Sequence, residues 1–181
     1  GGLQITKGEE KVMVENAFYT DHTFFDIFSF PIQEGGAQGL NEVKTTLISV
    51  KLARALYGHV SPIGEMIELS SMNGTRNYQI IGVFENNEPS HVDTDIIMSL
   101  VTLEKAWDTN FAMGWGSFDF VTYLKMKPHT DVASFETLLP AFLDRHGGER
   151  LGSNRIDLNL QSVMDIHLHS HHNQEISTNE Q

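Results

Sequence analysis

The chain has 181 residues and a formal net charge of −12, from 24 acidic residues against 12 Lys and Arg. This balance argues against a nucleic-acid ligand, because nucleic-acid binders display clustered basic residues. Forty per cent apolar residues and only five prolines predict a folded chain of one domain or two small lobes. The absence of cysteine excludes disulfide scaffolds, thiolate zinc sites and cysteine nucleophiles.

The apolar runs all fall short of the roughly 18 to 20 residues that span a bilayer, and the start of the chain lacks a basic-then-apolar signal segment. The chain opens with Gly1-Gly2-Leu3 instead of Met. We therefore expect it to be a piece of a longer protein.

The first predicted elements are a strand over residues 11–19, where apolar residues alternate loosely, and a short helix over residues 23–30. Pro31 ends this helix, because a proline disfavours helical geometry in the residue before it. Three aromatic side chains share one side of the helix and are expected to pack in the core: Phe24, Phe25 and Phe28.

Residues 43–50 are rich in β-branched side chains and predict a strand that leads into a short amphipathic helix. Leu52, Ala55 and Leu56 lie at positions i, i+3 and i+4, so one face of the helix is apolar, and we expect Leu52 and Leu56 to be buried. Gly58 suits the left-handed position that closes a helix.

A hairpin follows, with strands at residues 66–70 and 78–84 joined by Asn73-Gly74, a strong hairpin signal. We expect Ile67 to be buried. Another strand is predicted at residues 96–100 and a short helix at residues 103–107.

A glycine-containing segment at residues 111–116 is predicted to separate two lobes. Residues 118–126 have apolar side chains on both alternating faces, which is typical of a central strand. A helix is expected from Asp131 to about residue 146, kinked or shortened by Pro140 and ended by Gly147-Gly148.

The last predicted strand covers residues 156–163, where Leu and Ile alternate with polar residues. Strand–helix units thus flank a β-rich middle, which predicts an α+β fold. Residues 1–40 and 117–170 would form one discontinuous α/β lobe, and residues 41–116 an inserted, mostly β lobe. Residues 171–181 would form a polar tail.

Histidines near the end of the chain are the most conspicuous candidate for chemistry. On an extended segment, His167, His169 and His171 would share one face and could bind zinc or copper. The alternative is a polar terminus of biased composition that binds metal only adventitiously. We favour this alternative and expect no metal site, because such a site needs oriented supporting partners.

Ser90, His91 and Asp93 place the residue types of a hydrolase triad together, but neighbours in sequence cannot easily reach the triad geometry. No GxSxG elbow is present. The glycines at residues 35–39 lack the Lys-Ser/Thr that follows in a phosphate-binding loop. We therefore expect neither catalysis nor nucleotide binding.

Four short motifs occur in a fixed order: FFxxF at residues 24–28, AxxLYG at 53–58, PIG at 62–64 and GVF at 82–84. With the loop Glu88-Pro89-Ser90-His91 and the DIHL element at residues 165–168, this order resembles the extracytoplasmic core domain of MacB/FtsX-type ABC transporter permeases. The resemblance covers most of residues 12–170. The positions that carry it, which we expect to be structural, are Phe24, Phe25, Phe28, Ala53, Leu56, Tyr57, Gly58, Pro62, Ile63, Gly64, Gly82, Pro89, His91, Asp165 and His167.

The resemblance implies a porter-like α/β subdomain interrupted by a smaller, mostly β subdomain, with about one strand–helix unit preceding Gly1. It implies a non-catalytic domain at the periplasmic face of the inner membrane, held by flanking membrane helices. Such a domain relays ATP-driven motion to substrate export, lipoprotein extraction or signalling.

The implied partners are a second permease copy, a cytoplasmic ABC ATPase and a periplasmic adaptor or lipoprotein. ATP is used by the ATPase, and this chain is expected to hold no cofactor. The rival interpretation is a free-standing extracytoplasmic module that binds a solute or a metal ion.

Overall fold

The computed structural model describes residues 2–72, 74–86, 92–106, 120–151 and 156–165. The chain divides into two compact units, Gly1–Asp108 and Thr109–Gln181, which are considered separately. No helix in the described ranges is both long and apolar enough to cross a membrane.

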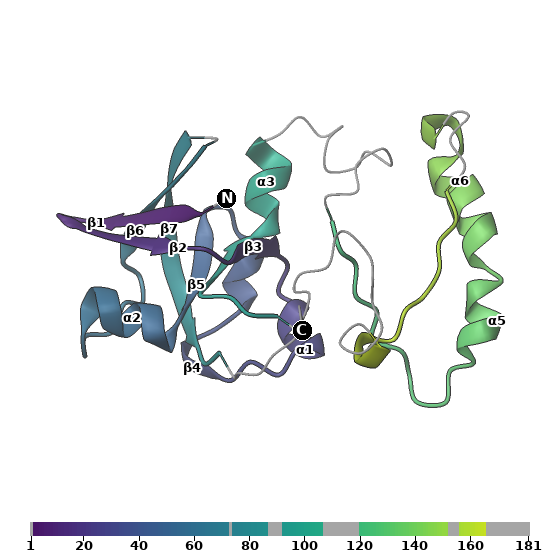
Figure 1. The fold of residues 1–181 in the computed structure, drawn as a ribbon, viewed down its shortest axis with the longest axis horizontal. Coiled ribbons are helices and arrows are strands. Elements are labelled where there is room, and N and C mark those ends of the chain that lie inside the picture. The colour runs from purple at the N-terminus through teal and green to yellow at the C-terminus, as the bar shows by residue number, and fades with distance from the viewer. Residues whose placement is uncertain (1, 73, 87–91, 107–119, 152–155, 166–181) are drawn as a thin grey trace. The chain divides into compact units, whose positions relative to one another are not determined.

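The first unit is built on one eight-stranded mixed sheet (Figure 1). Seven strands follow the order β2-β1-β6-β7-β5-β8-β3, and β4 pairs with β7 beside this path. The strands are β1 (Leu3–Lys7), β2 (Glu10–Val14), β3 (Ala17–Thr20), β4 (Ile32–Gly35), β5 (Thr45–Ser49), β6 (Met66–Ser71), β7 (Gly74–Phe84) and β8 (Ile96–Ser99). The helices are α1 (Phe24–Ile27), the 3-10 turn η1 (Gln38–Asn41), α2 (Val50–Tyr57) and α3 (Leu100–Ala106).

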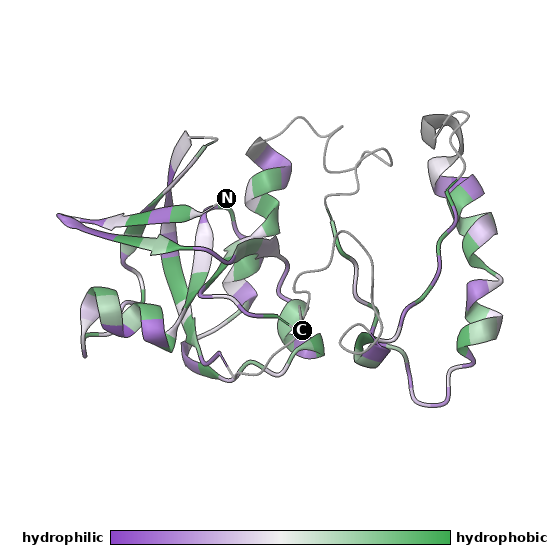
Figure 2. Cartoon of the chain, viewed as in Figure 1, coloured by the Kyte–Doolittle hydropathy of each residue, from purple (hydrophilic) through white to green (hydrophobic). Residues whose placement is uncertain are grey.

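Strand β7 is the longest, with 11 residues, and three other strands pair with it. Its first half pairs antiparallel with β6, and its second half pairs parallel with β5. The last residues, Gly82 to Phe84, also pair antiparallel with β4. This second half is largely hydrophobic (Figure 2), as expected for a strand inside a sheet.

The sheet carries a hydrophobic core on each face. In β5, the adjacent residues Leu47 and Ile48 belong to different clusters, because successive strand residues point to opposite faces. One cluster includes Leu52, Ala53 and Leu56 of α2. The other includes Phe24 of α1 and Leu40 of η1, so helical segments cover both faces.

A β-bulge in β7 adjusts which side chains reach each core. Thr46 is paired with Ile80 whereas Leu47 is paired with Gly82, so Ile81 has no partner in the ladder. As a result Ile80 and Val83, three residues apart, belong to the same core. A Cβ at Gly82 would lie 2.8 Å from Leu47 Cδ2, which explains why this position of the GVF motif has no side chain.

The α+β fold class is confirmed, as is the burial of Leu52, Leu56 and Ile67, each at most 4% exposed. The predicted strands at residues 43–50, 66–70, 78–84 and 96–100 are present with small shifts at their ends. The prediction of one strand over residues 11–19 was wrong. Strand β2 ends at Val14, and β3 lies at the opposite edge of the sheet.

The turn between β2 and β3 is held by a loop from far along the chain. Thr94 Oγ1 donates to the carbonyl of Asn16 at 2.9 Å, and the Asp95 amide donates to the same carbonyl at 3.4 Å. Nothing local in the sequence signals this break, because its partners lie about 78 residues away.

The helix predicted over residues 23–30 is shorter, since it ends at Ile27 where Phe28 takes up extended geometry. The chain before it turns at Asp21, whose Oδ1 accepts a hydrogen bond from the Thr23 amide at 2.8 Å.

In the second unit, the single helix predicted from Asp131 is two helices, α5 (Val132–Glu136) and α6 (Leu139–Leu151). Asp131 caps α5: its Oδ1 accepts from the Ser134 amide at 3.2 Å, and its Oδ2 accepts from Ser134 Oγ at 2.6 Å. These bonds to the charged form lower the pKa of Asp131. Pro140 is the second residue of α6, where no amide hydrogen is needed, and the two glycines do not end the helix.

Two predicted strands are not formed. Residues 120–126, the described part of the segment 118–126, and residues 156–162 have no strand pairing. Alternating apolar residues were therefore not sufficient to predict a strand, because a strand requires a pairing partner that the pattern does not identify. The helix predicted at residues 103–107 is present as α3 and begins earlier.

The predicted boundary at residues 111–116 falls a few positions after the division between Asp108 and Thr109. The predicted boundary between residues 40 and 41 falls inside the continuous sheet, because β1 pairs with β6 and β3 pairs with β8. Whether residues 117–170 complete a lobe with residues 1–40 stays a prediction. The tail at residues 171–181 lies outside the described residues.

Replacing Gly35 by Ala should lower the free energy of unfolding by about 2 to 5 kcal/mol. Gly35 has φ +70°, and an added Cβ would overlap the carbonyl oxygen of Ile81 in the neighbouring strand. The matched control is Gly36→Ala, since a Cβ there meets no atom within 4 Å. Urea unfolding of both variants measures the difference; equal losses in the two would contradict the close packing of β4 on β7.

Candidate functional site

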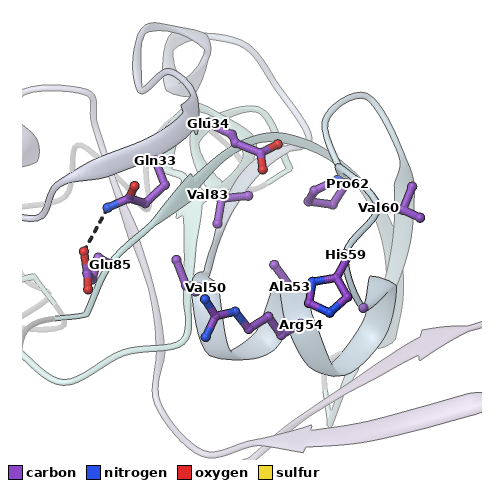
Figure 3. Close-up of a pocket in the computed structure, with 11 residues that line it drawn as sticks. Gln33, Glu34, Val50, Ala53, Arg54, His59, Val60, Pro62, Val83 and Glu85 are labelled. Atoms are coloured by element: carbon purple, nitrogen blue, oxygen red, sulfur yellow. Dashed lines mark hydrogen bonds between the residues drawn. The ribbon is translucent and has the colours of Figure 1, made fainter.

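A pocket of about 360 Å³ opens between α2, the turn that follows it, and strands β4 and β7 (Figure 3). It is lined by Gln33, Glu34, Val50, Ala53, Arg54, Gly58, His59, Val60, Pro62, Val83 and Glu85. The AxxLYG, PIG and GVF motifs all contribute to it. The structure therefore brings together three sequence motifs that are separated in the chain.

Helix α2 is fixed at its start by Ser49. The Ser49 hydroxyl accepts a hydrogen bond from the Leu52 amide at 3.0 Å, as an N-cap does. The same hydroxyl donates to Asp95 Oδ1 at 2.6 Å, and Lys51 Nζ lies 3.7 Å from Asp95 Oδ2. Asp95, just before β8, thus attaches the first turn of α2 to the sheet.

The helix ends at Gly58, as the sequence predicts. Gly58 has φ +63°, and its amide donates to the Arg54 carbonyl at 2.9 Å. This positive φ, which residues with a Cβ rarely adopt, explains the glycine of the AxxLYG motif. It directs the chain to Pro62, which lies on the pocket wall.

The PIG turn is attached to β7 by two backbone hydrogen bonds. The Gly64 amide donates to the Ile80 carbonyl at 2.8 Å, and the Ile80 amide donates to the Glu65 carbonyl at 2.9 Å. Gly64 has φ +89°, which favours glycine. Ile63 is 39% exposed, so this motif residue is not part of the core.

Charged side chains occupy two sides of the pocket. Figure 3 shows Glu34 on one side and Arg54, with His59 beside it, on the other. Glu34 Oε2 accepts from Ser61 Oγ at 2.6 Å. Glu85 Oε2 accepts from Gln33 Nε2 at 2.8 Å.

Tyr57 of the AxxLYG motif is held by a cation. Lys7 Nζ lies 3.6 Å from the centre of the Tyr57 ring and donates to the Leu56 carbonyl at 2.5 Å. The Tyr57 hydroxyl is buried and has no hydrogen-bond partner among the described residues. Burial, and then the nearby Glu65 carboxylate, raise the pKa of Tyr57.

The FFxxF motif lies in the second core and not at the pocket. The Phe24 ring is central, with its centre 4.8 Å from that of Phe28 and 5.3 Å from those of Phe18 and Phe25. Phe25 also meets the Phe84 ring, at 6.4 Å. These edge and tilted contacts are the usual packing of aromatic cores.

Several predicted site residues cannot be placed. Pro89, His91, His167, His169 and His171 lie outside the described residues, as does Ser90. Asp93 is described, and its carboxylate accepts from the Asn86 side chain at 2.8 Å. Asp165 is exposed in the second unit. In the described part of the chain, no group of three or more His, Asp and Glu could hold a metal ion.

The sequence does not indicate that Gln33, Glu34 and Glu85 line a pocket. They reach the pocket because β4 pairs with β7, a contact across about fifty residues that carries no local signal. The arrangement offers charged and hydrogen-bonding groups around an apolar floor.

Comparison with known proteins identifies the family that the chain resembles. The family model of the MacB-like periplasmic core domain matches residues 2–142. No curated protein matches the chain significantly.

Two of the solved structures that match the chain illustrate the shared fold. A domain assigned to a permease protein of Porphyromonas gingivalis has a TM-score of 0.66 at 18% identity, over 89% of this chain and 75% of that one. The periplasmic region of MacB from Actinobacillus actinomycetemcomitans has a TM-score of 0.55 at 11% identity, over 83% of this chain and 65% of that one. The chain thus spans about two thirds to three quarters of these neighbours.

Proposed function

Because the chain belongs to the family of MacB-like periplasmic core domains, we propose that it is the extracytoplasmic domain of an ABC transporter permease. In this proposal the domain catalyses no reaction. It relays motion, driven by ATP in a separate or fused ATPase domain, to substrate export, lipoprotein extraction or signalling. The domain itself needs no cofactor, and the histidines at 167, 169 and 171 form no functional metal site.

The partners we propose are a second copy of the permease, a cytoplasmic ABC ATPase, and a periplasmic adaptor or lipoprotein. Flanking membrane helices would hold the domain at the periplasmic face of the inner membrane. Nucleic acid is not among the proposed partners, since the chain carries a net charge of −12.

The construction of the first unit is the observation that carries this proposal. A relay must transmit displacement and not absorb it. Strands β1 to β8 share one sheet, and both its faces are packed with buried side chains. Well-packed interiors have few voids and low compressibility, so such a unit moves as one body.

The rival interpretation, a free-standing extracytoplasmic solute- or metal-binding module, differs in two respects that can be tested. It requires no coupling to a nucleotide cycle and no second copy. The pocket beside α2 would be compatible with either interpretation.

The proposed location can be tested with a single introduced cysteine, since the chain has none. In intact cells, a membrane-impermeant maleimide should label the Val60→Cys variant of the permease, because Val60 is 72% exposed. The control is Leu56→Cys, at a position only 4% exposed, which should react only after denaturation. Labelling of Val60→Cys that requires permeabilised cells would contradict an extracytoplasmic location.

The relay can be tested by spin-label distances in the reconstituted permease with its ATPase. A label at Val60→Cys in each copy should report different inter-copy distances in nucleotide-free and ATP-trapped states. A second label at Met13→Cys, exposed on β2, gives the distance within one copy when labelled chains are diluted with unlabelled ones. That internal distance should stay constant, as expected for a stiff body.

Two results would contradict the relay. The inter-copy distance could be identical in both nucleotide states, which would leave no motion to transmit. Alternatively, the internal distance between positions 13 and 60 could change as much as the inter-copy distance, which would show that the domain absorbs the motion.

A further inference from the structure

We propose that the pocket between α2, β4 and β7 binds a short ligand of the amino-acid or peptide class that carries both amino and carboxylate groups. Its amino groups would lie at Glu34 and Glu85, and its carboxylate at Arg54. The inference stands on the pocket geometry and does not rest on the proposed function.

The floor of the pocket is apolar and belongs to the folded core. Ala53 and Val83 are 8% and 4% exposed, and both belong to the cluster that joins α2 to the sheet. Pro62 and Val60 add apolar walls (Figure 3). A volume of about 360 Å³ falls in the range of small-molecule sites.

Two carboxylates, Glu34 and Glu85, line different edges of the pocket, and Figure 3 shows Glu85 beside Gln33. Their hydrogen-bond donors, Ser61 for Glu34 and Gln33 for Glu85, are neutral groups. Neither glutamate forms an ion pair with a basic side chain of the described residues. Each carboxylate retains lone pairs for a cationic donor.

Arg54 supplies the opposite charge on the other side of the pocket (Figure 3). No carboxylate of the described residues lies within 4.0 Å of its guanidinium. A guanidinium matches a carboxylate geometrically and can bind it through two parallel hydrogen bonds. An anionic group of the ligand therefore has a preferred partner here.

The two sides together select a ligand that carries both charges. A purely anionic ligand would meet two glutamates and a chain of net charge −12. A purely cationic ligand would leave Arg54 unused. An amine and a carboxylate joined by a short chain satisfy both sides while their carbon skeleton covers the apolar floor.

The test is a titration of the ¹⁵N-labelled 181-residue chain with the dipeptide Gly-Lys, followed by amide chemical shifts. We expect saturable shifts at pocket residues, including Gly58 and His59, with a Kd of about 1 mM, which is usual for a ligand of this size. The double variant Glu34→Gln, Glu85→Gln should weaken binding about tenfold, and Arg54→Gln about fivefold.

The amidated dipeptide identifies the role of Arg54. It should bind wild-type protein about as weakly as Gly-Lys binds Arg54→Gln, and Arg54→Gln should not weaken it further. Matched controls are Glu10→Gln and Lys11→Gln, which are exposed on β2, a strand that β1 and β6 separate from β7. Both controls should bind Gly-Lys with wild-type affinity.

The substituted side chains are exposed, so the variants should keep the dispersed amide spectrum of the folded chain. Three outcomes would overturn the proposal. Shifts could be absent at ten times the expected Kd, they could spread over the acidic surface instead of the pocket, or Glu10→Gln could weaken binding as much as the pocket variants do.

Discussion

The pairing of β4, β5 and β6 with the single strand β7 is the constraint on which the rest of this structure depends. Because three strands share one partner, each must meet β7 at the right register. The bulge at Ile81 and the missing side chain at Gly82 make this possible, since Leu47 occupies the space that a Cβ would need. From this one strand follow both hydrophobic cores, the position of α2 and the position of the pocket.

The motifs that resemble the permease family are best understood as parts of this arrangement. Gly58 ends α2 at the correct point, and Gly64 returns the chain to a backbone hydrogen bond with Ile80. Phe24 fills the opposite face of the sheet. The motifs thus specify how helices and turns attach to β7. The charged rim of the pocket is a separate property, supplied by Glu34 and Glu85 outside these motifs and by Arg54 at a variable position of the AxxLYG motif.

Sequence reasoning succeeded where the signal is local. Local residues predict the burial of Leu52 and Leu56 and the end of α2 at Gly58. They also predict the hairpin of β6 and β7, through the turn at Asn73-Gly74. It failed where structure depends on distant partners: the break after Val14 is held by Thr94, and residues 120–126 alternate without finding a strand to pair with. Glu34 and Glu85 could not be predicted at one site for the same reason, because only the pairing of β4 with β7 brings them there.

Native-state hydrogen exchange tests the central role of β7 most directly. If β7 organises the whole first unit, the amides of Ile80, Val83 and Phe84 should exchange only through global unfolding, with the same free energy as those of β5 and β8. Urea should lower these free energies with the slope of global unfolding. Exchange of the β7 amides at a much lower free energy than those of β5 would contradict the account, because the sheet would then survive the opening of its proposed organising strand.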